Sequence, residues 1–153
     1  MNKNVNILIE GIVCGEDESK ITTRASGYYR LLGDMHLIKY TESAVVGDET
    51  ADATGMADER AGREGLNTIK LSSKLVEMIK SGENRTHMVF DLTEPTQSVY
   101  ETPYGSLYFR IETSSIELEE KENRITLNME YSLFHEDSHI SDNRIYIIIE
   151  GSY

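Results

Sequence analysis

One motif in the sequence has the residue types and spacing of a catalytic metal centre. His135, Glu136 and His139 form an HExxH pattern, in which two histidines one helical turn apart bind zinc and the glutamate acts as a general base. That chemistry requires a helix, so that both imidazoles lie on one face. Here the first histidine ends an alternating apolar–polar run, the following residues are typical of a turn, and no third ligand can be assigned. We therefore assign no catalytic zinc.

A second pattern resembles a calcium-binding loop. Acidic and hydroxyl residues stand at the first, third, fifth, seventh and twelfth positions of an EF-hand-like loop, namely Asp48, Thr50, Asp52, Thr54 and Glu59. The sixth position, where the loop needs glycine, holds Ala53, and no helical pattern flanks the segment. A solvated acidic loop is the simpler interpretation, and we assign no metal or cofactor to the chain.

Other residue types that perform catalysis are few. Cys14 is the only cysteine and follows an apolar alternation, which predicts a packed strand-end thiol rather than a nucleophile. Four glutamates, Glu117, Glu119, Glu120 and Glu122, gather near one turn, where a carboxylate pair could in principle transfer protons. A solvated hairpin turn explains them more simply. Because no acid, base and nucleophile set can be named, we expect no enzymatic activity and no catalytic residues.

The composition describes an acidic globular domain. The chain has 153 residues, 39% hydrophobic and 27% charged, with a formal net charge of −12, and this length suits one domain with its own core. The charge argues against nucleic acid or an anionic membrane as partner, because both bind clustered lysines and arginines. The single cysteine excludes an internal disulfide, and the N-terminus lacks the apolar stretch of a signal peptide. We expect a cytoplasmic protein.

The elements that must position any site are predicted to be strands. The strongest signal lies in Tyr100–Tyr131, where Gly105–Ile116 and the following run, Arg124–Leu133, alternate apolar and polar residues on either side of an acidic turn at Glu119–Asn123. Strict alternation over this length predicts a hairpin of half-buried antiparallel strands.

The rest of the chain continues this pattern. Further strands are predicted at Val5–Cys14, Ser19–Leu32, Met35–Glu42, Leu66–Leu71, Lys74–Lys80, Arg85–Leu92, Gln97–Glu101 and Asn143–Glu150. Gly27 predicts a bulge or a sharp bend within the second of these, and Gly33-Asp34 a two-residue hairpin turn. The segment 43–65 has no sustained period and is predicted to be a long acidic loop. The expected fold is all-β: residues 1–153 form a single up-and-down antiparallel β-barrel of about 8–10 strands, with a sandwich as the alternative.

A barrel of this size is either filled by side chains or holds one small ligand. The candidate ligand-binding residues are those expected on the inner faces of the strands, namely Phe90, Phe109, Ile111, Leu127, Met129 and Tyr131. The alternative interpretation is that these side chains pack against one another.

Several short segments resemble a family of small bacterial proteins. The sequence YETPYGSL at 100–107, the pair Glu112-Thr113 and the strand ITLNMEYSL at 125–133 resemble the YwiB-like family, as do Ser26–Tyr29 and the strand end at Tyr40. The resemblance implies a calycin-type, lipocalin-like barrel and a protein of unknown function. Calycins hold small apolar molecules, so it also implies ligand binding, whereas the family offers no catalytic residues to transfer. The stretch 43–65 is longer than the family's pattern.

Three hypotheses about function follow. The first is a non-enzymatic barrel that binds a small, partly apolar ligand in its interior. The second is an interaction module with a filled barrel that acts through its outer face or the 43–65 loop, with a homodimer as one form. The third, an enzyme, would require convergent histidines or carboxylates. A cavity of several hundred cubic ångströms, roughly the lower bound for ligand pockets, would favour the first.

Overall fold

The computed structural model describes residues 4–15, 19–42, 66–81 and 85–151. Ten β-strands occupy these ranges. They are β1 (Asn4–Cys14), β2 (Ser19–Leu32), β3 (Met35–Glu42), β4 (Asn67–Leu71), β5 (Leu75–Lys80), β6 (Arg85–Asp91), β7 (Thr96–Thr102), β8 (Gly105–Lys121), β9 (Arg124–His135) and β10 (Ser138–Gly151). None of the described segments forms a helix long and apolar enough to cross a membrane. The predicted loop at 43–65, with its EF-hand-like pattern, lies outside the described residues.

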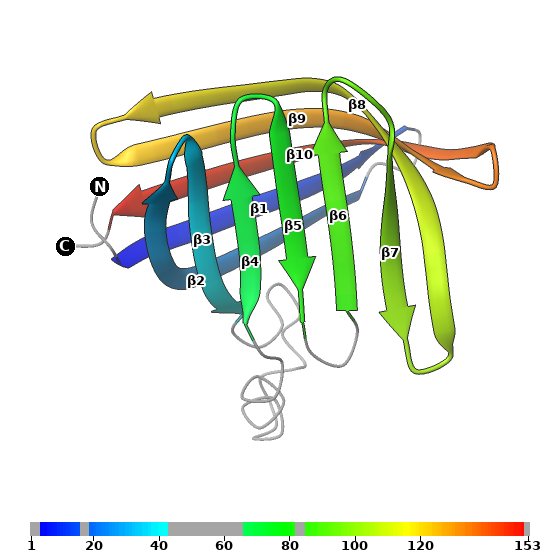
Figure 1. The fold of residues 1–153 in the computed structure, drawn as a ribbon, viewed down its shortest axis with the longest axis horizontal. Helices are drawn as coiled ribbons and strands as arrows, with labels where there is room; N and C mark the ends of the chain where they lie inside the picture. Colours follow the sequence, from blue (N-terminus) through cyan, green and yellow to red (C-terminus); the bar gives the residue numbers. More distant parts are fainter. Residues whose placement is uncertain (1–3, 16–18, 43–65, 82–84, 152–153) are drawn as a thin grey trace.

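The strands form one closed antiparallel barrel. Their order around it is β1-β10-β9-β8-β7-β6-β5-β4-β3-β2, so that every strand pairs with its sequence neighbours and the first strand pairs with the last (Figure 1). In the closing pair Val5 lies opposite Gly151 and Ile7 opposite Ile149. Closure therefore gives each of the ten described strands a hydrogen-bonded neighbour on both sides. The predicted all-β, up-and-down barrel is therefore confirmed, at ten strands.

Two long strands, β2 and β8, pair with different neighbours along their two halves. β2 pairs with β1 along Ser19–Tyr28 and with β3 along Ala25–Leu32; β8 is likewise shared between β7 and β9. In Figure 1, β4–β7 run across the direction of β9, β10 and β1, and β8 bends from the first direction into the second. Crossed sheets of this kind meet at corners that long, bent strands make.

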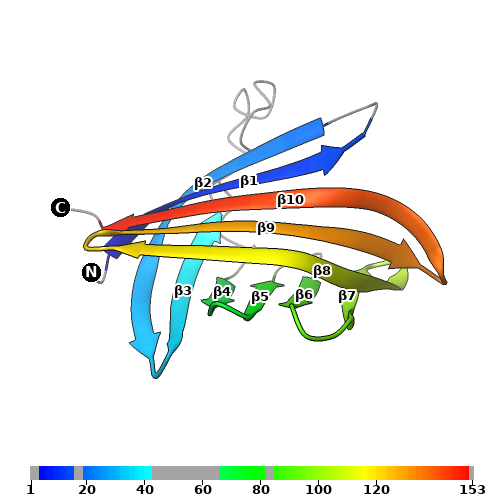
Figure 2. The same ribbon diagram turned by 90° about the horizontal axis from the view of Figure 1, so that it is seen from above.

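Gly27 lies in the part of β2 that is paired on both sides. The register through this stretch is continuous, so of the two predicted alternatives, a bulge and a sharp bend, the bulge is wrong. β2 does bend along its length, as Figure 2 shows. The glycine is required for another reason: a Cβ atom at this position would lie 2.3 Å from the carbonyl oxygen of Lys39 on β3. Only a residue without a side chain permits this approach of two backbones.

The inner faces of the strands meet in one apolar core. Its residues with at most 3% exposure are Val5, Ile7, Ile38, Tyr40, Ile69, Leu71, Val76, Phe90, Ile111, Ile125, Leu127, Met129, Ile147 and Ile149. They come from eight of the ten strands and follow the period-2 alternation of the sequence. Removal of these side chains from water is the main favourable contribution to folding.

Most predicted strands agree with the structure to within one or two residues, and two differ more. β8 continues to Lys121, so the predicted turn at Glu119–Asn123 is shorter, and β10 begins at Ser138 rather than Asn143. The pairing shifts register between Thr113 and Ser115 in β8 and between His139 and Ser141 in β10. A bulge inverts the alternation of inward and outward side chains. A prediction that assumes unbroken alternation therefore stops at the bulge and makes the strand too short.

Candidate functional site

Three polar side chains form a hydrogen-bonded chain at one end of the barrel. The Tyr29 hydroxyl lies 2.6 Å from His36 Nδ1, and His36 Nε2 lies 2.7 Å from Glu120 Oε1. Because a carboxylate only accepts hydrogen bonds, Nε2 donates to Glu120, and in the neutral imidazole Nδ1 then accepts the proton of the phenol. His36 is only 6% exposed, and each of its two ring nitrogens has a hydrogen-bond partner within the protein.

Local structure explains why these side chains converge. Tyr29 and His36 lie on the inner faces of β2 and β3, on the hairpin whose predicted turn at Gly33-Asp34 is confirmed. Gly33 has a positive φ of 62°, which glycine adopts without strain. Glu120 faces inward, opposite Ile125, because the bulge in β8 has inverted the alternation. Figure 2 shows the β2–β3 and β8–β9 hairpins at the same end of the barrel.

A pocket of about 460 Å³ opens at this end. Its lining residues are Tyr29, Leu31, Gly33, Asp34, His36, Glu120, Lys121, Glu122 and Ile125. A volume of this size lies in the range of small-molecule sites. Ile125 belongs to the core, so one wall of the pocket is formed by a core residue. We call it the mouth pocket.

The electrostatics of the mouth pocket favour a hydrogen-bond donor as ligand. The hydroxyl proton of Tyr29 and the Nε2 proton of His36 are already engaged, whereas the three carboxylates on the lining can accept further bonds. Lys121, the one lysine on the lining, has its ammonium 3.3 Å from Glu119. Burial, and then the charge of Glu120, raise the pKa of Tyr29. The phenol therefore stays protonated, which suits hydrogen bonding rather than nucleophilic attack.

The HExxH residues lie in the β9–β10 hairpin and not on a helix. His135 is the last residue of β9, and Glu136 and Asp137 form the turn with positive φ angles of 48° and 68°. His135 Nδ1 lies 3.2 Å from the Tyr108 carbonyl oxygen, whereas His139 Nε2 lies 2.8 Å from Asp142 Oδ1. The two rings thus have different partners. Among the residues that the structure describes, no group of three or more metal-ligating side chains is arranged to hold an ion.

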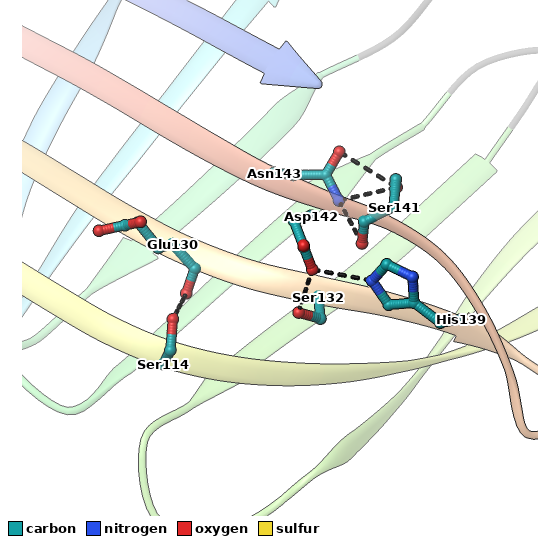
Figure 3. A network of polar contacts seen from close by, with 7 residues as sticks. All are labelled: Ser114, Glu130, Ser132, His139, Ser141, Asp142 and Asn143. Carbon is teal, nitrogen blue, oxygen red and sulfur yellow. Dashed lines mark hydrogen bonds and ion pairs between the residues drawn. The ribbon is translucent and has the colours of Figure 1, made fainter. Parts of the chain in front are cut away.

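His139 takes part in a polar network that contains the residue types of a catalytic triad (Figure 3). Ser132 Oγ donates to Asp142 Oδ1 at 2.6 Å, and His139 Nε2 contacts the same oxygen. In a triad the histidine lies between the serine and the acid and removes the serine proton. Here the aspartate lies between them, so this chemistry is not available. The hydrogen bond from Ser132, and then that from His139, lower the pKa of Asp142.

The six predicted lining residues lie away from the mouth pocket. Phe90, Ile111, Leu127 and Met129 are fully buried in the core, and the Tyr131 ring packs edge-on against Phe90 with centroids 4.8 Å apart. Phe109 instead lines a second pocket of about 450 Å³ that contains Thr96, Tyr108 and Arg110 among its other residues. That these six side chains contact a ligand stays a prediction.

Sequence reasoning missed Tyr29 and His36 as site residues and named Glu120 only as one of four clustered glutamates. The alternation of β2 and β3 could have placed Tyr29 and His36 on inner faces. The contact of His36 with Glu120 could not be predicted from alternation, because it joins two strands that are distant in sequence.

Comparison with known proteins supports the fold and gives no activity. Residues 7–147 match the family described as "Domain of unknown function (DUF1934)". The structure is similar to the crystal structure of the ywiB protein from Bacillus subtilis, with a TM-score of 0.74 and 16% sequence identity, over 99% of this chain and 93% of that chain. At this identity the similarity shows the fold alone. No functionally curated protein matches the chain.

Proposed function

This chain belongs to the YwiB-like family of unknown function, DUF1934, and on that premise we propose that it is a non-enzymatic barrel that binds a small, partly apolar molecule. The observation that supports this proposal is the mouth pocket, which has the volume of a small-molecule site and has the core residue Ile125 in its lining. We include in the same proposal that the barrel is related to the calycins, as the resemblance implies, and that the protein is located in the cytoplasm.

The lining of the mouth pocket indicates how such a molecule would bind. Its polar end would donate hydrogen bonds to Glu120 and to the other carboxylates of the lining, and its apolar part would contact Leu31 and Ile125. Leu31 is 56% exposed although it lies on the inner face of β2. An apolar group in contact with Leu31 would therefore remove apolar surface from water, at about 25 cal/mol per Å².

The experiment is native mass spectrometry of the protein purified from its own cells, with a denatured sample as reference. We expect an additional mass that disappears on denaturation. A matched pair of variants locates the site: Leu31→Asp changes the pocket lining, whereas Leu32→Asp changes an exposed leucine next to it that does not line the pocket. The additional mass should be lost in the first variant and kept in the second. Equal retention in both, or no additional mass in the unmodified protein, would contradict the proposal.

A second candidate function is self-association, which one surface feature favours. The β7–β8 hairpin exposes four large apolar side chains, namely Tyr100, Tyr104, Leu107 and Tyr108, with Tyr104 99% exposed. Tyr100 and Leu107 lie opposite each other in the β7–β8 pairing and share one face of the hairpin, whereas Tyr108 lies on the other face. Adjacent exposed apolar groups such as Tyr100 and Leu107 are common at protein interfaces. Sedimentation velocity over a range of concentrations would detect a homodimer, and Tyr104→Ser should weaken it. A monomer at all concentrations would exclude this candidate.

A further inference from the structure

The hydrogen bond between His36 and Glu120 crosses the barrel. β3, which carries His36, and β8, which carries Glu120, are separated by β4–β7 in one direction around the barrel and by β9, β10, β1 and β2 in the other. The contact therefore joins opposite walls. The Arg124–Glu150 ion pair, by comparison, joins the hydrogen-bonded neighbours β9 and β10. The Tyr29–His36–Glu120 chain ties the two walls of the mouth together.

The hairpin that carries Tyr29 and His36 has little other packing at its tip. Every residue from Arg30 to Asp34 is exposed, including two leucines, Leu31 at 56% and Leu32 at 47%. Segments with few buried contacts open at a lower free energy than the core of a domain. The buried His36 ring is thus the anchor nearest to a tip that is otherwise solvated.

Glu120, at the other end of this hydrogen-bonded chain, is accessible to solvent. The Glu120 side chain is 58% exposed, whereas the His36 side chain is 7% exposed. A carboxylate in contact with water can exchange its partner at small cost, and a ligand that donates a hydrogen bond can compete with His36 for it. The carboxylate of Glu120 would then accept a hydrogen bond from His36 in the ligand-free protein and from the ligand in the complex.

We propose that the Tyr29–His36–Glu120 chain is a clasp, which holds the β2–β3 hairpin against β8 and must release for a molecule to pass between the mouth pocket and the core. The passage of a ligand rests on the proposed function. The clasp itself is a property of the ligand-free protein. When the bond to Glu120 breaks, the β2–β3 tip loses its attachment to the opposite wall and moves away from Ile125, which forms the inner end of the pocket.

Hydrogen–deuterium exchange of the full-length, ligand-free protein tests the clasp. In Glu120→Ala we expect the amides of β2 and β3 near the turn, from Leu31 to His36, to exchange about tenfold faster, which corresponds to the loss of one hydrogen bond to a charged group. Glu122→Ala removes a carboxylate that also lines the pocket but has no contact with His36 among the described interactions, and it should leave these rates unchanged. Glu120→Gln keeps an acceptor oxygen and should give an intermediate rate.

A further variant, Tyr29→Phe, separates a local effect on the hairpin from a general loss of stability. Tyr29→Phe removes the bond from Tyr29 to His36 and should also accelerate exchange at the hairpin, while amides around Leu127 in the core keep their rates. Equal rates in Glu120→Ala and Glu122→Ala, or acceleration of the whole barrel in both Glu120→Ala and Tyr29→Phe, would overturn the clasp. Neither result depends on a ligand, so the clasp can fail while the native mass spectra still show a bound molecule, and the reverse also holds.

Discussion

Two partly buried phenol groups in this barrel, those of Tyr29 and Tyr131, differ in their surroundings and therefore in their acid–base behaviour. Tyr29 hydrogen-bonds to His36 and lies near the charge of Glu120, whereas Tyr131 packs against the ring of Phe90. Burial alone raises the pKa of Tyr131 to about 12, from an ordinary value of 10.0. Removal of its proton inside the apolar core would leave a desolvated phenolate.

The high pKa of Tyr131 predicts a loss of stability in alkaline solution. The folded protein holds the phenol proton more tightly than the unfolded chain does, so this stabilisation is fully present below pH 10 and is lost as the pH rises from 10 towards 12. By pH 12 the loss should amount to about 2 kcal/mol. Urea unfolding between pH 9 and about 12 would measure it. Tyr131→Phe cannot ionise and should lose less stability over this range; an identical decline in both proteins would contradict the assignment.

Single residues also mark the limit of what the sequence could predict about the site. Ile111, Leu127 and Met129 were placed on inner faces by alternation, and all three are in the core. Alternation reports which face a side chain occupies and not which distant side chain it meets. His36 and Glu120 are 84 positions apart, a separation given by their numbers, and only closure of the barrel brings them into contact.

At the scale of the elements, the bulge in β8 decides where the site lies. Ile111 and Thr113 face inward before it, and Ile116, Leu118 and Glu120 face inward after it. If β8 continued in regular alternation from Thr113 without a bulge, Glu120 would point to solvent and the His36 contact would not form. Strand existence and pairing order followed from apolar alternation and turn residues, but the positions of the two bulges did not, because a single inserted residue has no compositional signature.

The corner at Gly27 gives a prediction for this element. Gly27→Ala should destabilise the barrel by about 1–3 kcal/mol, because the new methyl group would overlap the Lys39 carbonyl and force β2 and β3 apart. Gly11→Ala in β1 is a matched control, since a Cβ there has nothing within 4 Å, and it should change stability by less than about 0.5 kcal/mol. Chemical denaturation of both variants measures the difference, and equal effects would show that the close approach is not what requires Gly27.

At the scale of the whole molecule, closure joins the two ends of the chain. β1 pairs with β2 on one side and with β10 on the other, so residues from the start and the end of the sequence enter the same core. Ile7 of β1 and Ile69 of β4 both belong to it. A barrel in which each strand has two neighbours has no element that can leave without breaking two sets of hydrogen bonds, which predicts cooperative unfolding.

Substitutions in two distant strands test this cooperativity. Ile7→Ala and Ile69→Ala each remove a side chain that is at most 3% exposed and should lower the free energy of unfolding by about 2–5 kcal/mol. In both variants the transition followed by far-UV circular dichroism should coincide with that followed by tyrosine fluorescence, because the barrel unfolds as one unit. Ile21→Ala, at a 70% exposed position in β2, should change stability by less than about 0.5 kcal/mol. If Ile7→Ala instead gave an early transition in only one of the two signals, β1 could separate from an intact remainder, and closure would not be what makes the barrel cooperative.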